Sequence, residues 1–73
     1  MTKGYQIHYK THPGHHILDS YSPDLAWRIP LKMGRLFQAR IQAEARAPDG
    51  HIIGEVFKRN GRLTWWCESK EGK

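Results

Sequence analysis

Hydrophobic and polar residues alternate with a period of two along much of this chain, which is typical of strands with one buried face. Near the N-terminus, aromatic and aliphatic side chains alternate with polar ones, and we predict a strand over Tyr5–Lys10. Pro13-Gly14 is a turn signal. A second strand is predicted over residues 15–21, so the chain opens with two strands joined by a short turn.

A helix is predicted to follow, because Ser22, Pro23 and Asp24 form a helix-start pattern in which Ser22 caps the exposed N–H groups. Its apolar side would be formed by Leu25, Ala26, Trp27 and Ile29. Pro30 should limit or kink this helix, since it lacks an N–H and clashes one turn back. Residues 31–34 could add a further turn, which a glycine at position 34 would weaken.

Residues 36–47 carry conflicting signals. Apolar and polar residues alternate strictly there, which predicts a strand, whereas the Ala, Arg, Gln and Glu content favours a helix. Burial of one face contributes more than the propensity difference, so we predict a strand and keep the helix as the alternative. Pro48-Asp49-Gly50 is then a turn in which Gly50 can adopt positive φ.

Asn60-Gly61 between two alternating runs predicts a hairpin over residues 51–59 and 62–68, because a type I′ turn needs φ > 0 at both central residues. A two-residue loop also fixes the register. The expected cross-strand pairs are Arg59–Arg62, Lys58–Leu63, Phe57–Thr64, Val56–Trp65, Glu55–Trp66 and Gly54–Cys67.

The register assigns each hairpin side chain to one of two faces. The expected core face holds Ile52, Gly54, Val56, Lys58, Leu63, Trp65 and Cys67. The other face holds Ile53, Glu55, Phe57, Arg59, Arg62, Thr64, Trp66 and Glu68, and this mixture of aromatic and basic groups is typical of a binding surface. Trp27 and Trp65 are predicted to be core residues.

These elements predict an α+β fold: a small twisted antiparallel β-sheet of three to five strands with one short helix on one face. Residues 1–73 are expected to form a single domain with flexible tails at residues 1–4 and 69–73. Cys67 is the sole cysteine, so no disulfide can form within the chain, and we expect a structural role for it in a reducing compartment. Neither a run of about 18 apolar residues nor a signal peptide is present, and we expect a cytoplasmic protein.

Twelve Lys and Arg residues against seven Asp and Glu give a formal charge of +5, which favours an acidic protein surface or nucleic acid as partner. No membrane contact or small-molecule substrate is expected. The predicted partner-binding residues are Phe57, Lys58, Arg59, Arg62, Trp66, Arg40 and Arg46. A second basic patch is predicted from Arg28, Lys32 and Arg35, which flank the helix and its exit.

The sequence contains no nucleophile elbow, phosphate loop or dinucleotide fingerprint, so we expect neither an enzyme nor a cofactor. His12, His15 and His16 are the cluster with metal-ligand character, but no Cys pair or H-x-x-x-H spacing accompanies them. We therefore interpret them as solvated loop residues and predict no metal site.

Chain length, basic charge, the lack of catalytic motifs and the hairpin-rich stretch AEARAPDGHIIGEVFKRNGRLTWWCESKEGK make the chain similar to small transcription regulators of lytic Xanthomonas phages. The resemblance implies binding to the N-terminal region of the host RNA polymerase β′ subunit. It further implies inhibition of initiation by σ displacement, and suppression of termination together with NusA.

The order of elements and the hairpin residues Lys58, Gly61 and Trp65 also resemble small anti-CRISPR proteins that end in a Lys-x-x-Gly-x-x-Trp-like hairpin, with spacing that departs by a residue. That resemblance implies inhibition of a host effector complex. A small basic nucleic-acid-binding module is the other alternative that the composition leaves open.

Overall fold

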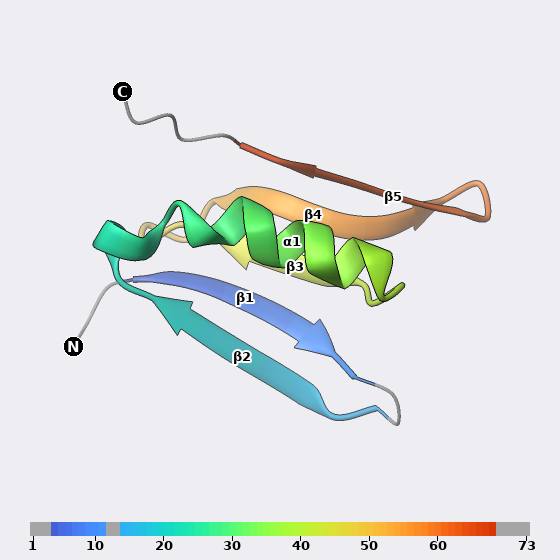
Figure 1. Ribbon diagram of the computed structural model, residues 1–73, viewed down its shortest axis with the longest axis horizontal. Coiled ribbons are helices and arrows are strands. Elements are labelled where there is room, and N and C mark those ends of the chain that lie inside the picture. Colours follow the sequence, from blue (N-terminus) through green and yellow to red (C-terminus); the bar gives the residue numbers. More distant parts are fainter. Residues whose placement is uncertain (1–3, 12–13, 69–73) are drawn as a thin grey trace.

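The computed structural model describes residues 4–11 and 14–68, which contain five strands and one α-helix. Chain order is β1 (Tyr5–Lys10), β2 (His16–Tyr21), a 3-10 turn (Pro23–Leu25), α1 (Arg28–Gln38), β3 (Ala43–Arg46), β4 (Ile52–Arg59) and β5 (Arg62–Cys67). The strands form one antiparallel sheet in the order β2-β1-β3-β4-β5 (Figure 1). The predicted α+β class is confirmed. Of the residues expected to form flexible tails, the described part of the chain includes Gly4 alone.

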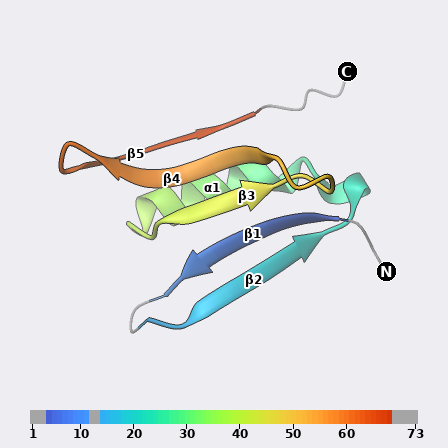
Figure 2. The same ribbon diagram turned by 180° about the vertical axis from the view of Figure 1, so that it is seen from behind.

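The fold has two layers, because α1 packs on one face of the sheet against β3, β4 and β5. Figure 2 shows the sheet from its other side, with β3 and β4 in front of the helix. Ile29, Met33 and Leu36 recur at helical spacing and are buried. The sheet contributes the other core residues, which are Ile7, Ala43, Ala45, Ile53 and Val56. No helix in the described segments is long and apolar enough to cross a membrane.

The start of the helix differs from the prediction. Pro23 and Asp24 begin a separate 3-10 turn, Ser22 makes no side-chain capping bond, and α1 begins at Arg28 and runs through Pro30. Pro30 is tolerated because it occupies the first turn of α1, where backbone N–H groups have no partner within the helix.

Residues 36–47 contain both a helix end and a strand, so the predicted continuous strand is wrong for its first part. Arg40 adopts φ 62°, the left-handed conformation that ends many helices. Its N–H donates to the Phe37 carbonyl at 3.0 Å, and the Ile41 N–H donates to the Leu36 carbonyl at 2.9 Å. These two bonds form a Schellman motif, after which the chain re-enters the sheet as β3.

The hairpin register is confirmed at all six predicted pairs, and Asn60 and Gly61 have φ of 56° and 80°. The predicted faces fail at one end of β4, where Ile53 is 7% exposed and Ile52 is 38% exposed. A bulge explains the exchange, because Ala45 pairs with Gly54 while the next residue, Arg46, pairs with Ile52. The extra residue in β4 reverses the side-chain alternation there, so that Ile53 points into the core.

The two tryptophans predicted as core residues have different environments. Trp65 lies on the helix side of β5, with its ring centroid 6.1 Å from that of Phe37. It is 36% exposed and lies outside the buried core, so its assignment to the core is wrong. Trp27 is 56% exposed, so its assignment to the core is wrong. It precedes Ile29 by two residues, or about 200° of helical rotation, and therefore lies away from the buried side.

Candidate functional site

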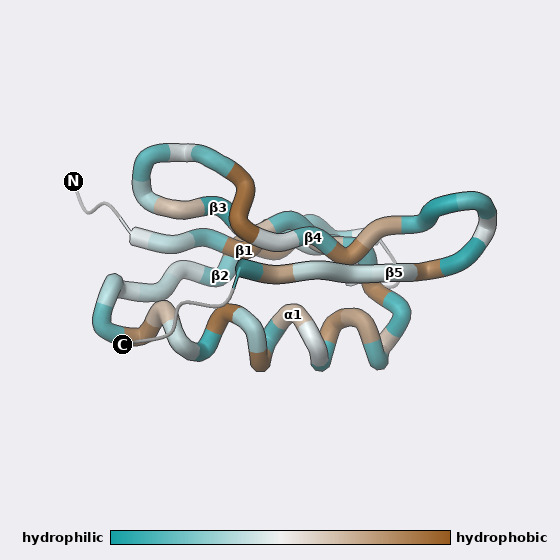
Figure 3. Tube along the Cα trace, turned by 90° about the horizontal axis from the view of Figure 1, so that it is seen from above, coloured by the Kyte–Doolittle hydropathy of each residue, from teal (hydrophilic) through white to brown (hydrophobic). Residues whose placement is uncertain are grey.

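The face of the sheet opposite α1 is not covered by any other element of residues 4–11 and 14–68 (Figure 3). Directly paired residues in an antiparallel sheet project to the same side, so the registers define the side chains on this face. They are Gln6, His8, Lys10, His16, Leu18, Ser20, Glu44, Arg46, Ile52, Glu55, Phe57, Arg59, Arg62, Thr64 and Trp66. We call this surface the open face.

The β4–β5 part of the open face holds an aromatic and basic cluster. Phe57 pairs with Thr64 and Trp66 pairs with Glu55, which makes the two aromatic rings diagonal neighbours. Trp66 is 41% exposed. A groove of about 580 Å³ runs over this cluster and is lined by Phe57, Arg59, Asn60, Arg62, Thr64, Trp65 and Trp66. The structure therefore brings Phe57, Trp66 and two arginines together, as the register predicted.

Arg59 and Arg62 are directly opposite each other and both are exposed. Ion pairs among the described residues involve neither of them. Like charges directly opposite on a sheet destabilise it, by a fraction of a kcal/mol. An acidic group placed between the two guanidinium groups would remove this repulsion and accept hydrogen bonds from both.

Carboxylates occupy the centre of the open face. Glu44 and Glu55 are cross-strand partners, and Arg46 Nη2 lies 2.6 Å from Glu44 Oε2. Arg46 also donates to the Gly50 carbonyl at 3.2 Å. The open face therefore presents acidic and basic groups side by side, with Arg46 held by its own neighbours.

Two histidines on the open face are neighbours, which the sequence did not indicate. His8 on β1 and His16 on β2 stack with ring centroids 5.5 Å apart. His8 also pairs with Glu44, because β1 lies between β2 and β3. Alternation along β1 places His8 on the polar face, but nothing in the local sequence indicates which strand lies beside it.

Two predicted partner-binding residues lie elsewhere. Arg40 was expected on a strand and instead follows the C-cap of α1 in the left-handed conformation, so its assignment to a strand is wrong. Lys58 pairs with Leu63 on the side of the hairpin that faces the helix layer, where it is exposed. Neither residue contributes to the open face.

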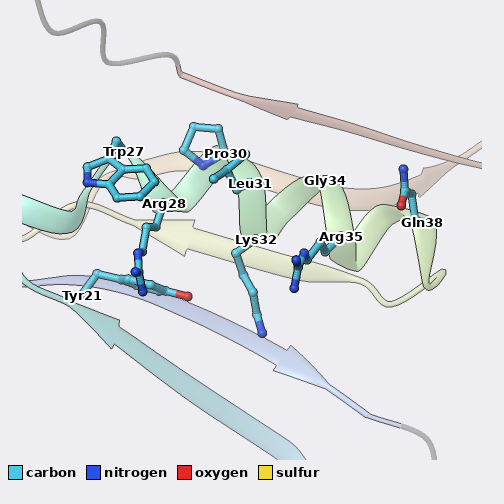
Figure 4. Close-up of a pocket in the computed structure, with 9 residues that line it drawn as sticks. All are labelled: Tyr21, Trp27, Arg28, Pro30, Leu31, Lys32, Gly34, Arg35 and Gln38. Carbon is cyan, nitrogen blue, oxygen red and sulfur yellow. The ribbon is translucent and has the colours of Figure 1, made fainter.

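The second predicted basic patch forms a groove on the helix side of the sheet (Figure 4). Arg28, Lys32 and Arg35 come from one flank of α1, and Lys32 Nζ lies 3.2 Å from Asp19 Oδ2 on β2. Burial alone would lower the pKa of Lys32, but its contacts with Asp19 and Tyr9 raise it. The structure thus separates the predicted basic residues onto two opposite faces.

No group of three or more His, Cys, Asp or Glu suited to a metal ion occurs within residues 4–11 and 14–68. His12 lies outside those ranges, while His15 is exposed and His16 stacks on His8. Burial, with a smaller effect of Glu68, raises the pKa of the Cys67 thiol. A thiol with a raised pKa is a poor nucleophile at neutral pH.

Comparisons with known proteins identify no matching family model, curated protein or solved structure.

Proposed function

We propose that this protein is a non-catalytic binding protein that docks onto another protein through the open face of its sheet. The observation that carries the proposal is the exposed Trp66 beside Phe57, Arg59 and Arg62 on a face that no described element covers. Trp and Arg dominate the affinity of protein interfaces when they become buried against a partner. The strands hold these side chains in a fixed relative geometry, which lowers the entropy lost on binding.

A protein partner suits this surface better than a polyanion does. The Glu44 and Glu55 carboxylates at its centre would repel a phosphate backbone, whereas a protein can offer both signs of charge. Leu18 and Ile52 are exposed on the same face and supply apolar contact area. The expected partner surface is therefore partly apolar, with an acidic group that reaches Arg59 and Arg62.

The resemblance to phage transcription regulators supports bacterial RNA polymerase as this partner. The protein would act in the host cytoplasm, bind the β′ subunit, inhibit initiation by displacing σ factor, and suppress termination with NusA. An anti-CRISPR-type inhibitor of a host effector complex would use the same surface and is the alternative. Both are binding functions that need no cofactor.

Binding to purified bacterial core polymerase, freed of nucleic acid, tests the proposal. We expect Arg59→Glu combined with Arg62→Glu to weaken binding at least about tenfold, a loss of about 1.4 kcal/mol. The matched control is Arg28→Glu with Arg35→Glu, which makes the same charge change on the other side of the sheet and should leave affinity within about twofold. No binding by the wild-type protein would refute bacterial polymerase as the partner, and equal losses for both pairs would refute the open face as the docking surface.

A further inference from the structure

The groove along α1, which reaches Tyr21 at the end of β2, has a different chemistry from the open face. It encloses about 640 Å³ and is lined by Tyr21, Trp27, Arg28, Pro30, Leu31, Lys32, Gly34, Arg35 and Gln38. Figure 4 shows the side chains of Arg28, Lys32 and Arg35 extending from α1 toward the side of β1 and β2. We call these three residues the cation row.

The periodicity of α1 explains why the cation row forms. Arg28, Lys32 and Arg35 each precede one of the buried residues Ile29, Met33 and Leu36. One residue is about 100° of helical rotation, so the cation row runs along the flank of the helix beside the buried stripe. The axial rise is about 6 Å from Arg28 to Lys32 and about 4.5 Å from Lys32 to Arg35. The result is a row of three cations about 10 Å long.

Little negative charge balances the cation row. Lys32 is paired with Asp19 and also lies over the Tyr9 ring, with Nζ 4.9 Å from its centroid. Arg28 and Arg35 form no ion pair with any carboxylate in residues 4–11 and 14–68. Arg28 and Arg35 therefore leave the groove with an excess of positive charge that is complementary to a polyanion.

Aromatic surface accompanies this charge. Trp27 is more than half exposed at the mouth of the groove, and the Arg28 guanidinium carbon lies 5.3 Å from its ring centroid. Tyr21 lines the opposite wall from β2, and Figure 4 places its ring beside Arg28. Proteins that bind single-stranded nucleic acid combine cations along the path of the phosphate backbone with exposed aromatic rings on which bases stack.

We propose that this groove binds single-stranded nucleic acid, with phosphates along the cation row and a base stacked on Trp27. The ligand and the surface both differ from those of the proposed protein-binding function, so either proposal can fail without the other. An exposed indole favours a single strand, because the bases of a duplex are already stacked on one another.

Fluorescence anisotropy with a labelled oligodeoxythymidylate of about 12 nucleotides tests this proposal. Between about 50 and 200 mM salt, the logarithm of the association constant should fall against the logarithm of salt with a slope of about −2, for three phosphates. Arg28→Gln with Arg35→Gln should reduce that slope by about 1.4 and lower affinity at least tenfold at about 50 mM salt.

The matched control is Arg59→Gln with Arg62→Gln, which removes the same charge from the open face and should leave affinity within about twofold. Trp27→Ala should weaken binding about fivefold or more through lost stacking. Circular dichroism would verify that every variant keeps the wild-type fold. Absence of binding at about 50 mM salt, or equal losses for the two arginine pairs, would overturn the site. Unchanged affinity of Trp27→Ala, or equal competition by a duplex, would overturn its single-strand character.

Discussion

Trp65 lies directly over Gly34: two atoms of its six-membered ring are 3.7 Å from the point where a Cβ of Gly34 would stand. This contact joins β5 to α1 and places the Trp65 indole against the helix. The next residue, Trp66, projects to the open face instead. The two adjacent tryptophans therefore lie on opposite faces of the sheet: Trp65 packs against α1, and Trp66 lies on the open face.

Alanine substitution should separate these two roles. We expect Trp65→Ala to lower the free energy of unfolding by about 2–3 kcal/mol, below the range for a fully buried Trp because the ring is partly exposed. Trp66→Ala should lower it by less than about 1 kcal/mol. Urea denaturation followed by circular dichroism measures both values. Equal losses would contradict the stronger packing that the contact with Gly34 gives Trp65.

Gly34 can be replaced without a clash. A Cβ there would make ordinary van der Waals contact with Trp65, and alanine has the higher helix propensity. We expect Gly34→Ala to raise the free energy of unfolding by about 0.5–1 kcal/mol.

Gly54→Ala is the contrasting variant. A Cβ at Gly54 would lie 3.1 Å from Cys67 Sγ and 3.2 Å from the Trp66 carbonyl oxygen. We expect a loss of at least about 1 kcal/mol in the free energy of unfolding. A gain for Gly54→Ala would contradict the close approach of β5 to Gly54, and a loss for Gly34→Ala would contradict the packing of Trp65 over α1.

The left-handed conformation of Arg40 predicts a stabilising substitution. A non-glycine residue at positive φ costs about 1 kcal/mol relative to glycine, and helices commonly end with glycine at this position. Arg40→Gly should raise the thermal midpoint, corresponding to a gain of about 0.5–1 kcal/mol. Arg40→Ala removes the same charge but keeps the strained backbone conformation. An equal increase in stability for Arg40→Ala would therefore show that the loss of charge causes the effect.

The Cys67 thiol should react slowly. Burial raises its pKa, and Glu68 adds to the shift, so the thiolate fraction at a given pH is smaller than in an unfolded chain. Alkylation by iodoacetamide near pH 8 should be slower in native protein than in urea, and the native rate should rise at a higher pH. Equal native and unfolded rates after correction for urea would show that the thiol is not protected.

The hairpin could be predicted in detail because its determinants are local. Asn60-Gly61 specifies the turn and the turn specifies the register, so the sequence alone assigns Phe57, Trp66 and the two arginines to one face. The bulge at Ile53 could not be predicted, because it depends on how β3 pairs with β4.

Other features depend on contacts between segments distant in sequence. The alternation over residues 36–47 reads as a strand, yet packing of Leu36 against the sheet extends α1 to Gln38. Likewise, His8 is the cross-strand partner of Glu44 only because β1 pairs with β3. Trp27 was placed on the apolar side of a helix predicted to begin at Pro23, whereas α1 begins at Arg28 and its phase turns Trp27 outward.

Oxidative footprinting with mass spectrometry can show whether the open face is the protein-binding surface. Trp66 on the open face and Trp27 in the groove are both exposed, so each reports on one side of the molecule. With nucleic-acid-free bacterial core polymerase present, we expect oxidation of Trp66 to fall severalfold while Trp27 is oxidised as in the free protein. Protection of Trp27 with Trp66 unchanged would contradict this expectation.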